Sequence, residues 1–88
     1  MKTKSGYICR KVAEQNIVIP IKSTERDITV IVHLNDTGRF LWDLMAQDIS
    51  VEELTSALSE RYEIDENVAR NDVTSFICVL RNADLIED

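Results

Sequence analysis

The stretch ITVIVHLNDTGRFLWDLM, residues 28–45, decides the fold, because its side-chain periodicity changes from that of a strand to that of a helix. Five of its first seven residues are Val, Ile or Leu, a composition that predicts a strand at 28–34. Strict alternation would place the even-numbered residues of this strand on one face and the odd-numbered residues on the other. Asn35 can cap a helix by accepting hydrogen bonds from the free amides of the first turn. The apolar residues that follow recur at helical spacing, so the strand leads directly into a helix.

Two further strands are predicted upstream of this stretch, at residues 7–13 and 16–21. Pro20 marks the end of the second one or an edge position, because proline cannot donate to a strand ladder. Residues 22–27 form a polar connection to the strand at 28–34. Three consecutive strands joined by short connections predict an antiparallel meander.

Two further helices are predicted downstream. The run Ser50-Val51-Glu52-Glu53 has the pattern of a capping box, in which the first and last side chains each bond the other residue's amide. Asp65 caps the third helix, and Leu85 and Ile86 then fold back onto the core. This order predicts an α+β domain that resembles a winged helix with the wing placed first: a three-stranded antiparallel sheet followed by three helices. The whole chain is expected to form a single domain.

Composition and charge limit the classes of partner that this chain can bind. The chain has 88 residues, of which 30% are charged and 44% hydrophobic. No apolar run approaches membrane-spanning length and the N-terminus lacks the apolar core of a signal peptide, so a cytoplasmic protein with no membrane partner is expected. Residues 35–88 carry thirteen Asp/Glu against four Lys/Arg, which disfavours nucleic-acid partners because they are bound by neutralising phosphates. The acids suit protein or basic peptide partners, or serve only to keep a small domain in solution.

Residue types that usually catalyse reactions or bind metals and phosphates are scarce in this chain. The chain has one histidine, His33, two cysteines and two glycines. They form no zinc-binding spacing, no glycine-rich phosphate loop and no sequence pattern of a catalytic triad, so no cofactor, no metal and no catalytic residue is expected. Cys9 and Cys78 are interpreted as small buried apolar side chains. Trp42 lies off the main apolar stripe of its helix, where it covers the sheet edge or a helix junction, or else belongs to a binding surface.

A binding surface is predicted where the sheet ends. If the strand at 28–34 lies at the edge of the meander, its unpaired backbone can accept an extended peptide as an added strand. The third helix, if it packs beside this edge, forms the opposite wall of a groove and offers Arg70, Thr74, Cys78 and Arg81 at helical spacing. The two arginines pair either with carboxylates of a bound peptide or with acids of their own helix. The same edge could pair with a second copy, giving a homodimer by strand pairing or swapping.

The stretch LNDTGRFLWDL, residues 34–44, resembles the signature of the PqqD family, named for coenzyme PQQ synthesis protein D: a Leu-Asn-x-Thr-Gly turn leading into an aromatic helix. The resemblance extends from about Tyr7 to the end of the chain, and Asp84 departs from it where the family more often has glycine. Its further pieces lie at Ser50–Leu54, Tyr62–Asp65, Asp72–Phe76 and Leu80–Ile86. Nothing in the sequence is specific to the PQQ pathway, so the resemblance defines the family and not the pathway.

This resemblance implies a non-catalytic adaptor, a recognition element for ribosomally synthesised and post-translationally modified peptides (RiPPs). Such an adaptor binds the leader segment of a precursor peptide and presents it to a modifying enzyme, commonly a radical SAM (S-adenosylmethionine) protein, or to a leader peptidase. In the family the leader adds as a strand beside the third strand and lies against the third helix. Carried over to this sequence, the peptide-binding residues are Ile28, Thr29, Val30, Ile31 and Val32 of the strand and Arg70, Val73, Thr74, Ile77, Cys78 and Arg81 of the helix.

The alternative function is that of a winged-helix DNA-binding regulator. Its recognition helix should be basic, because phosphate neutralisation dominates affinity for DNA. The third predicted helix instead sets Asp65, Glu66 and Asp72 against Arg70 and Arg81. The charge pattern therefore favours the peptide adaptor.

Overall fold

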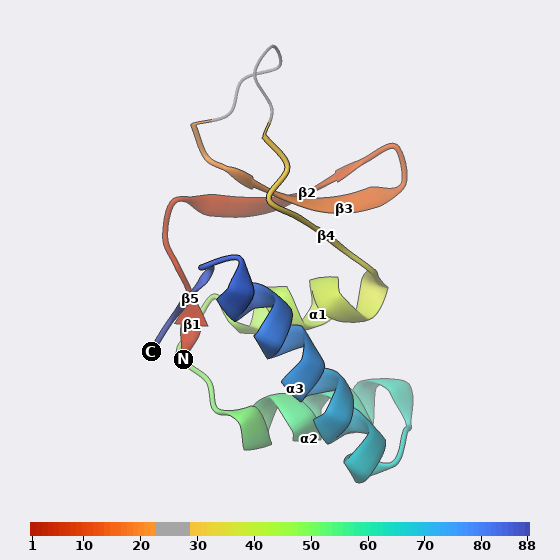
Figure 1. Cartoon of the computed structure of the whole chain (residues 1–88). Helices are drawn as coiled ribbons and strands as arrows, with labels where there is room; N and C mark the ends of the chain where they lie inside the picture. The colour runs from red at the N-terminus through yellow and green to blue at the C-terminus, as the bar shows by residue number, and fades with distance from the viewer. Residues whose placement is uncertain (23–28) are drawn as a thin grey trace.

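The computed structural model describes residues 1–22 and 29–88. Its elements confirm the predicted α+β class, a three-stranded antiparallel sheet followed by three helices. Figure 1 shows the sheet on one side of the helices and the two chain ends side by side. In chain order the elements are β1 (Lys2–Thr3), β2 (Tyr7–Val12), β3 (Gln15–Pro20), β4 (Val32–Leu34), α1 (Asp36–Leu44), α2 (Val51–Tyr62), α3 (Glu66–Asn82) and β5 (Ile86–Glu87).

The three-stranded sheet is the predicted meander, in the order β2-β3-β4 with both neighbours antiparallel. A tight turn joins β2 to β3, and both of its residues, Ala13 and Glu14, have positive φ. Such a turn matches the twist of the two strands. The order leaves β2 and β4 as the two edges of this sheet within the described part of the chain. A second, small sheet of β1 and β5 joins the chain ends and was not predicted.

The strand expected at 28–34 is shorter and less regular than its composition suggests. Ile28 lies outside the described residues, and β4 begins only at Val32. The amide of Ile31 donates to Val18 O at 2.9 Å, although Val18 is already opposite Val32 in the register. Two consecutive residues of one strand therefore face one residue of the other, which is the arrangement of a β-bulge.

The bulge overturns the predicted alternation of side chains. Alternation placed Ile31 on the face opposite to Val32, yet both side chains pack against the hydrophobic core. Leu34 is buried and His33 is exposed, as alternation requires beyond the bulge. Val30, expected on the same face as Val32, is 39% exposed.

The core lies between the sheet and the helices. The sheet contributes Val18 and Leu34, and Leu85 and Ile86 fold back onto the core as predicted. Trp42 is buried in this core, so it does not belong to an exposed binding surface, the second of its two expected roles. The helices contribute Leu41, Trp42 and Met45 near α1, Leu54 and Leu58 of α2, and Ala69, Val73, Ile77 and Leu80 of α3. Among the described residues, no helix is long and apolar enough to cross a membrane.

The predicted helix starts are confirmed in atomic detail. Asn35 Oδ1 accepts a hydrogen bond from Gly38 N at 2.7 Å at the start of α1. Ser50 and Glu53 form both bonds of the capping box of α2, and Asp65 caps α3 by accepting from Asn67 N. These contacts satisfy amides that have no partner within the helix.

The interpretation of the cysteines is wrong for Cys78, which is exposed on α3. Cys9 is half-buried on β2 and packs against the core. Burial raises the pKa of the Cys9 thiol, because the thiolate form is disfavoured away from water. Both cysteines are free thiols.

Replacing Thr55 by Val should stabilise the protein. Thr55 is fully buried in α2, and its hydroxyl has no hydrogen-bond partner within the described residues. Valine has nearly the same shape without this polar group, so the free energy of unfolding should rise by about 1 kcal/mol. Urea denaturation measures this change. Thr55→Ser is the control, because it keeps the hydroxyl and removes a methyl group, and it should lower stability. A lower midpoint for Thr55→Val would contradict the prediction.

Candidate functional site

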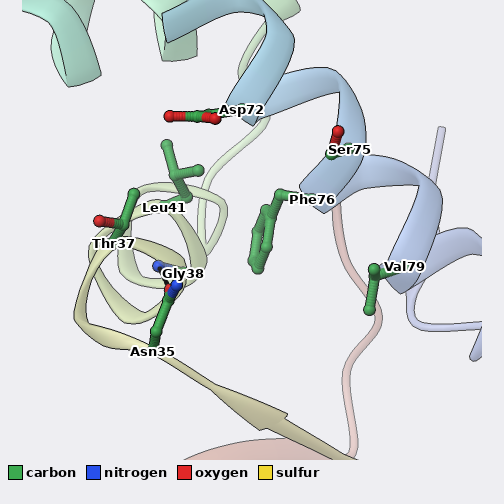
Figure 2. Close-up of a pocket in the computed structure, with 8 residues that line it drawn as sticks. All are labelled: Asn35, Thr37, Gly38, Leu41, Asp72, Ser75, Phe76 and Val79. Carbon is green, nitrogen blue, oxygen red and sulfur yellow. Dashed lines mark hydrogen bonds between the residues drawn. The ribbon is translucent and has the colours of Figure 1, made fainter. Parts of the chain in front are cut away.

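A cavity of about 300 Å³ opens between the first turns of α1 and the side of α3 (Figure 2). We call it the α1–α3 groove. Its apolar lining comes from Leu41, Phe76 and Val79, and the remainder is mostly polar. The complete lining is Asn35, Thr37, Gly38, Leu41, Asp72, Ser75, Phe76 and Val79.

The turn that leads from β4 into α1 forms one wall of this groove. Asn35 holds the first turn of α1 through its bond to Gly38 N. A Cβ atom at position 38 would lie 3.2 Å from Cε1 of Phe76 and 3.4 Å from Cβ of Leu34. The absence of a side chain at Gly38 therefore lets the Phe76 ring approach the α1 backbone. The Leu-Asn-x-Thr-Gly motif thus shapes the groove as well as starting the helix.

Replacing Gly38 by Val should destabilise the fold and distort the groove. Its Cβ would already crowd Phe76 and Asn35 at 3.2 Å, and two more methyl groups add to this overlap. Overpacking of this kind costs about 2 kcal/mol, measurable as a lower urea midpoint. Gly38→Ala should cost less, because better helix propensity offsets part of the strain. Equal stability of the wild type and the valine variant would show that the contact with Phe76 is not tight.

The α3 wall of the groove consists of Asp72, Ser75, Phe76 and Val79. These residues recur at helical spacing on one flank of α3, beside the buried stripe that contains Val73 and Ile77. The sequence did not single out this flank. Finding it required knowing which side of α3 faces α1.

The helix residues predicted to bind peptide lie elsewhere on α3. Val73 is fully buried and Ile77 is 8% exposed, so both belong to the core. The other four are exposed on the flank opposite to the groove wall, and none of the six lines the groove: Arg70, Val73, Thr74, Ile77, Cys78 and Arg81. Their contact with a peptide stays a prediction, without the support of a shared cavity.

The two arginines already have acidic partners in the chain. Arg70 lies 3.8 Å from a carboxylate oxygen of Glu52 and 4.0 Å from one of Glu66. Arg81 donates two hydrogen bonds to Asp88, at 3.0 and 3.1 Å, and this contact lowers the pKa of the Asp88 carboxyl. Pairing with acids of their own helix, one of the two expected roles, holds only for the contact of Arg70 with Glu66, because Glu52 lies in α2 and Asp88 lies beyond the end of α3.

The strand residues predicted to bind peptide lie along a free edge. β4 pairs with β3 on one side, and no strand in residues 1–22 and 29–88 pairs with its other side. Thr29 and Val30 are exposed, whereas Ile31 and Val32 are half-buried. The end of β4 adjoins the α1–α3 groove, because Asn35 follows β4 directly and lines the groove. The strand that carries the open edge therefore leads at its end into a residue of the groove wall.

The groove residues provide a surface for binding. Apolar side chains line it together with hydroxyl, amide and carboxylate groups, a combination typical of ligand sites. In the described part of the chain, no group of three His, Cys, Asp or Glu residues is arranged to hold a metal ion.

Comparisons with known proteins give two matches. The family model of coenzyme PQQ synthesis protein D (PqqD) matches residues 17–86. A solved structure described as TbiB1 in complex with the TbiA(beta) leader peptide superposes with a TM-score of 0.75. That match has 21% sequence identity and covers 99% of this chain and 95% of the other, so it shows a shared fold. The comparison with curated proteins gave no match.

Proposed function

Because this chain belongs to the PqqD family, we propose that it is a non-catalytic adaptor that binds the leader segment of a ribosomally synthesised precursor peptide. The observation that carries the proposal is the open edge of β4 beside the α1–α3 groove. An extended peptide can satisfy the free backbone groups of β4 while its side chains enter the groove. The similar structure was determined with a leader peptide bound, which supports the same role here.

The proposed binding site combines both stretches of the chain. Main-chain hydrogen bonds would form along residues 29–34, continuing toward Ile28, which lies outside the described residues. An apolar side chain of the leader would enter between Leu41, Phe76 and Val79. We further propose that the single domain, residues 1–88, presents the bound leader to a modifying enzyme such as a radical SAM protein, or to a leader peptidase.

The proposal can be tested without knowing the natural precursor. A phage-displayed library of random peptides is panned against the immobilised protein, and the tightest binder is synthesised with a fluorophore. We call it the selected peptide. Added to isotope-labelled protein, it should shift the NMR signals of residues 29–34 and 72–79. β2 is the internal control, since it is the other edge of the same sheet and lies outside the groove.

Two outcomes would contradict the proposal: no enrichment of any peptide, or shifts confined to β2. Random duplex DNA at low salt tests the alternative of a DNA-binding regulator. Salt-sensitive binding of duplex, with no peptide enriched, would favour that alternative.

A further inference from the structure

We propose that the α1–α3 groove selects a leader with a lysine or arginine near its apolar anchor, and that Asp72 is the residue that recognises this cation. This inference rests on the proposed function, because it concerns the chemistry of the peptide that the groove accepts. It follows the basic peptide partners that the acidic residues of the sequence suggested, and not the peptide carboxylates considered as partners for Arg70 and Arg81.

Asp72 lies on the groove wall together with Phe76 and Val79. Figure 2 shows the Asp72 carboxylate at one end of this row of side chains and Val79 at the other. Asp72 is exposed, and within the described residues it forms neither a hydrogen bond nor an ion pair. An exposed carboxylate at the end of an apolar groove is a natural contact for a cation.

The position of Asp72 in the helix gives no structural reason for an acid. α3 begins at Glu66, so Asp72 lies beyond the first turn, where acids are favoured by the helix dipole. Aspartate is also a poor helix former in a helix interior. The residue therefore contributes little to the stability of α3.

The charges of the helical part also favour a cationic peptide. Residues 35–88 have nine more acids than basic residues, thirteen against four. Each of the four arginines is already engaged: three pair with acids, and Arg61 lies over the ring of Tyr62. The helical part thus attracts a cationic peptide and offers few free cations to an acidic one.

Helix and strand geometry give the spacing of the two leader residues. Asp72 and Phe76 are four residues apart in α3, a rise of about 6 Å. In an extended peptide, side chains on the same face recur every ~6.7 Å. For a peptide that runs along the groove, the cation should therefore lie two residues from the apolar anchor, on the same face of the peptide.

The test compares libraries panned against the wild type and against Asp72→Lys. Peptides with Lys, Gln or Glu at the position two residues from the anchor are then synthesised in otherwise identical form and titrated by fluorescence anisotropy. For the wild type, the Lys peptide should bind about tenfold more tightly than the Glu peptide, and this preference should shrink at high salt. Asp72→Lys should reverse the order.

Glu60→Lys is the matched control. It makes the same change in net charge at an exposed position of α2 that does not line the groove. The proposal is supported if Asp72→Lys reverses the preference and Glu60→Lys preserves it. Equal effects of the two variants, or no charge preference in the wild type, would overturn it.

These experiments distinguish a failure of the role of Asp72 from a failure of the proposed function. If peptides are enriched and the groove variant Val79→Glu abolishes their binding, the proposed function stands whatever their charge. In that case, absence of a charge preference overturns only the role of Asp72. If no peptide is enriched, both fall together.

Discussion

Replacing Val79 by Glu should weaken binding of the selected peptide about a hundredfold and leave the fold intact. Val79 lines the groove and is 47% exposed, so the substitution disturbs little of the core. A bound peptide would cover this position with apolar surface, and an unpaired carboxylate buried there costs about 2–3 kcal/mol. Fluorescence anisotropy measures the affinity, and circular dichroism shows whether the helices are retained.

Val68→Glu is a closely matched control for this experiment. Val68 is on the same helix and is 49% exposed, almost the same fraction as Val79. The two positions are eleven residues apart, about three helical turns, so both side chains lie on the same flank of α3. Val68 does not line the groove, and its variant should bind the selected peptide like the wild type. Equal losses for the two variants would show that charge or stability, and not the groove, controls binding.

Replacing Val30 by Pro should weaken binding of the selected peptide about thirtyfold. This substitution tests the open strand edge, the second part of the proposed binding site. Ile31 uses its amide to bond Val18 of β3, so in an extended chain the amide of Val30 points toward the open edge. Proline removes that donor and places its ring at the edge, at a cost of about 2 kcal/mol to an added strand. The bond from Ile31 to β3 is untouched, so the fold should survive.

Val30→Ala completes this second experiment, since it keeps the amide and changes only the side chain. It should bind within a few-fold of the wild type, measured by the same anisotropy titration. A folded Val30→Pro variant with normal affinity would mean that the peptide does not pair with this edge.

The parts of the fold that depend on local contacts were predictable from the sequence. The caps at Asn35, Ser50 and Asp65 each satisfy amides two or three residues away, so their patterns are visible in a short window. The meander followed from short connections between strands. The family resemblance rests on the same local motifs, and the family match confirms it.

The parts that depend on distant contacts were not predictable. The bulge at Ile31 exists because Val18, thirteen residues earlier, accepts a bond outside the regular register. The groove flank of α3 is set by the approach of Phe76 to Gly38, two residues on different helices. Arg70 and Arg81 drew attention as rare cations, but the acids that engage them come largely from other parts of the chain.

The bulge at Ile31, directly before β4, also bears on why an open edge need not lead to aggregation. A regular strand, such as β2 of a second folded copy, repeats its donors and acceptors without interruption, so it would lose its match to this edge at the extra residue. A free peptide can adjust its torsion angles at that point. The irregular edge therefore suits a flexible segment better than a rigid, regular strand.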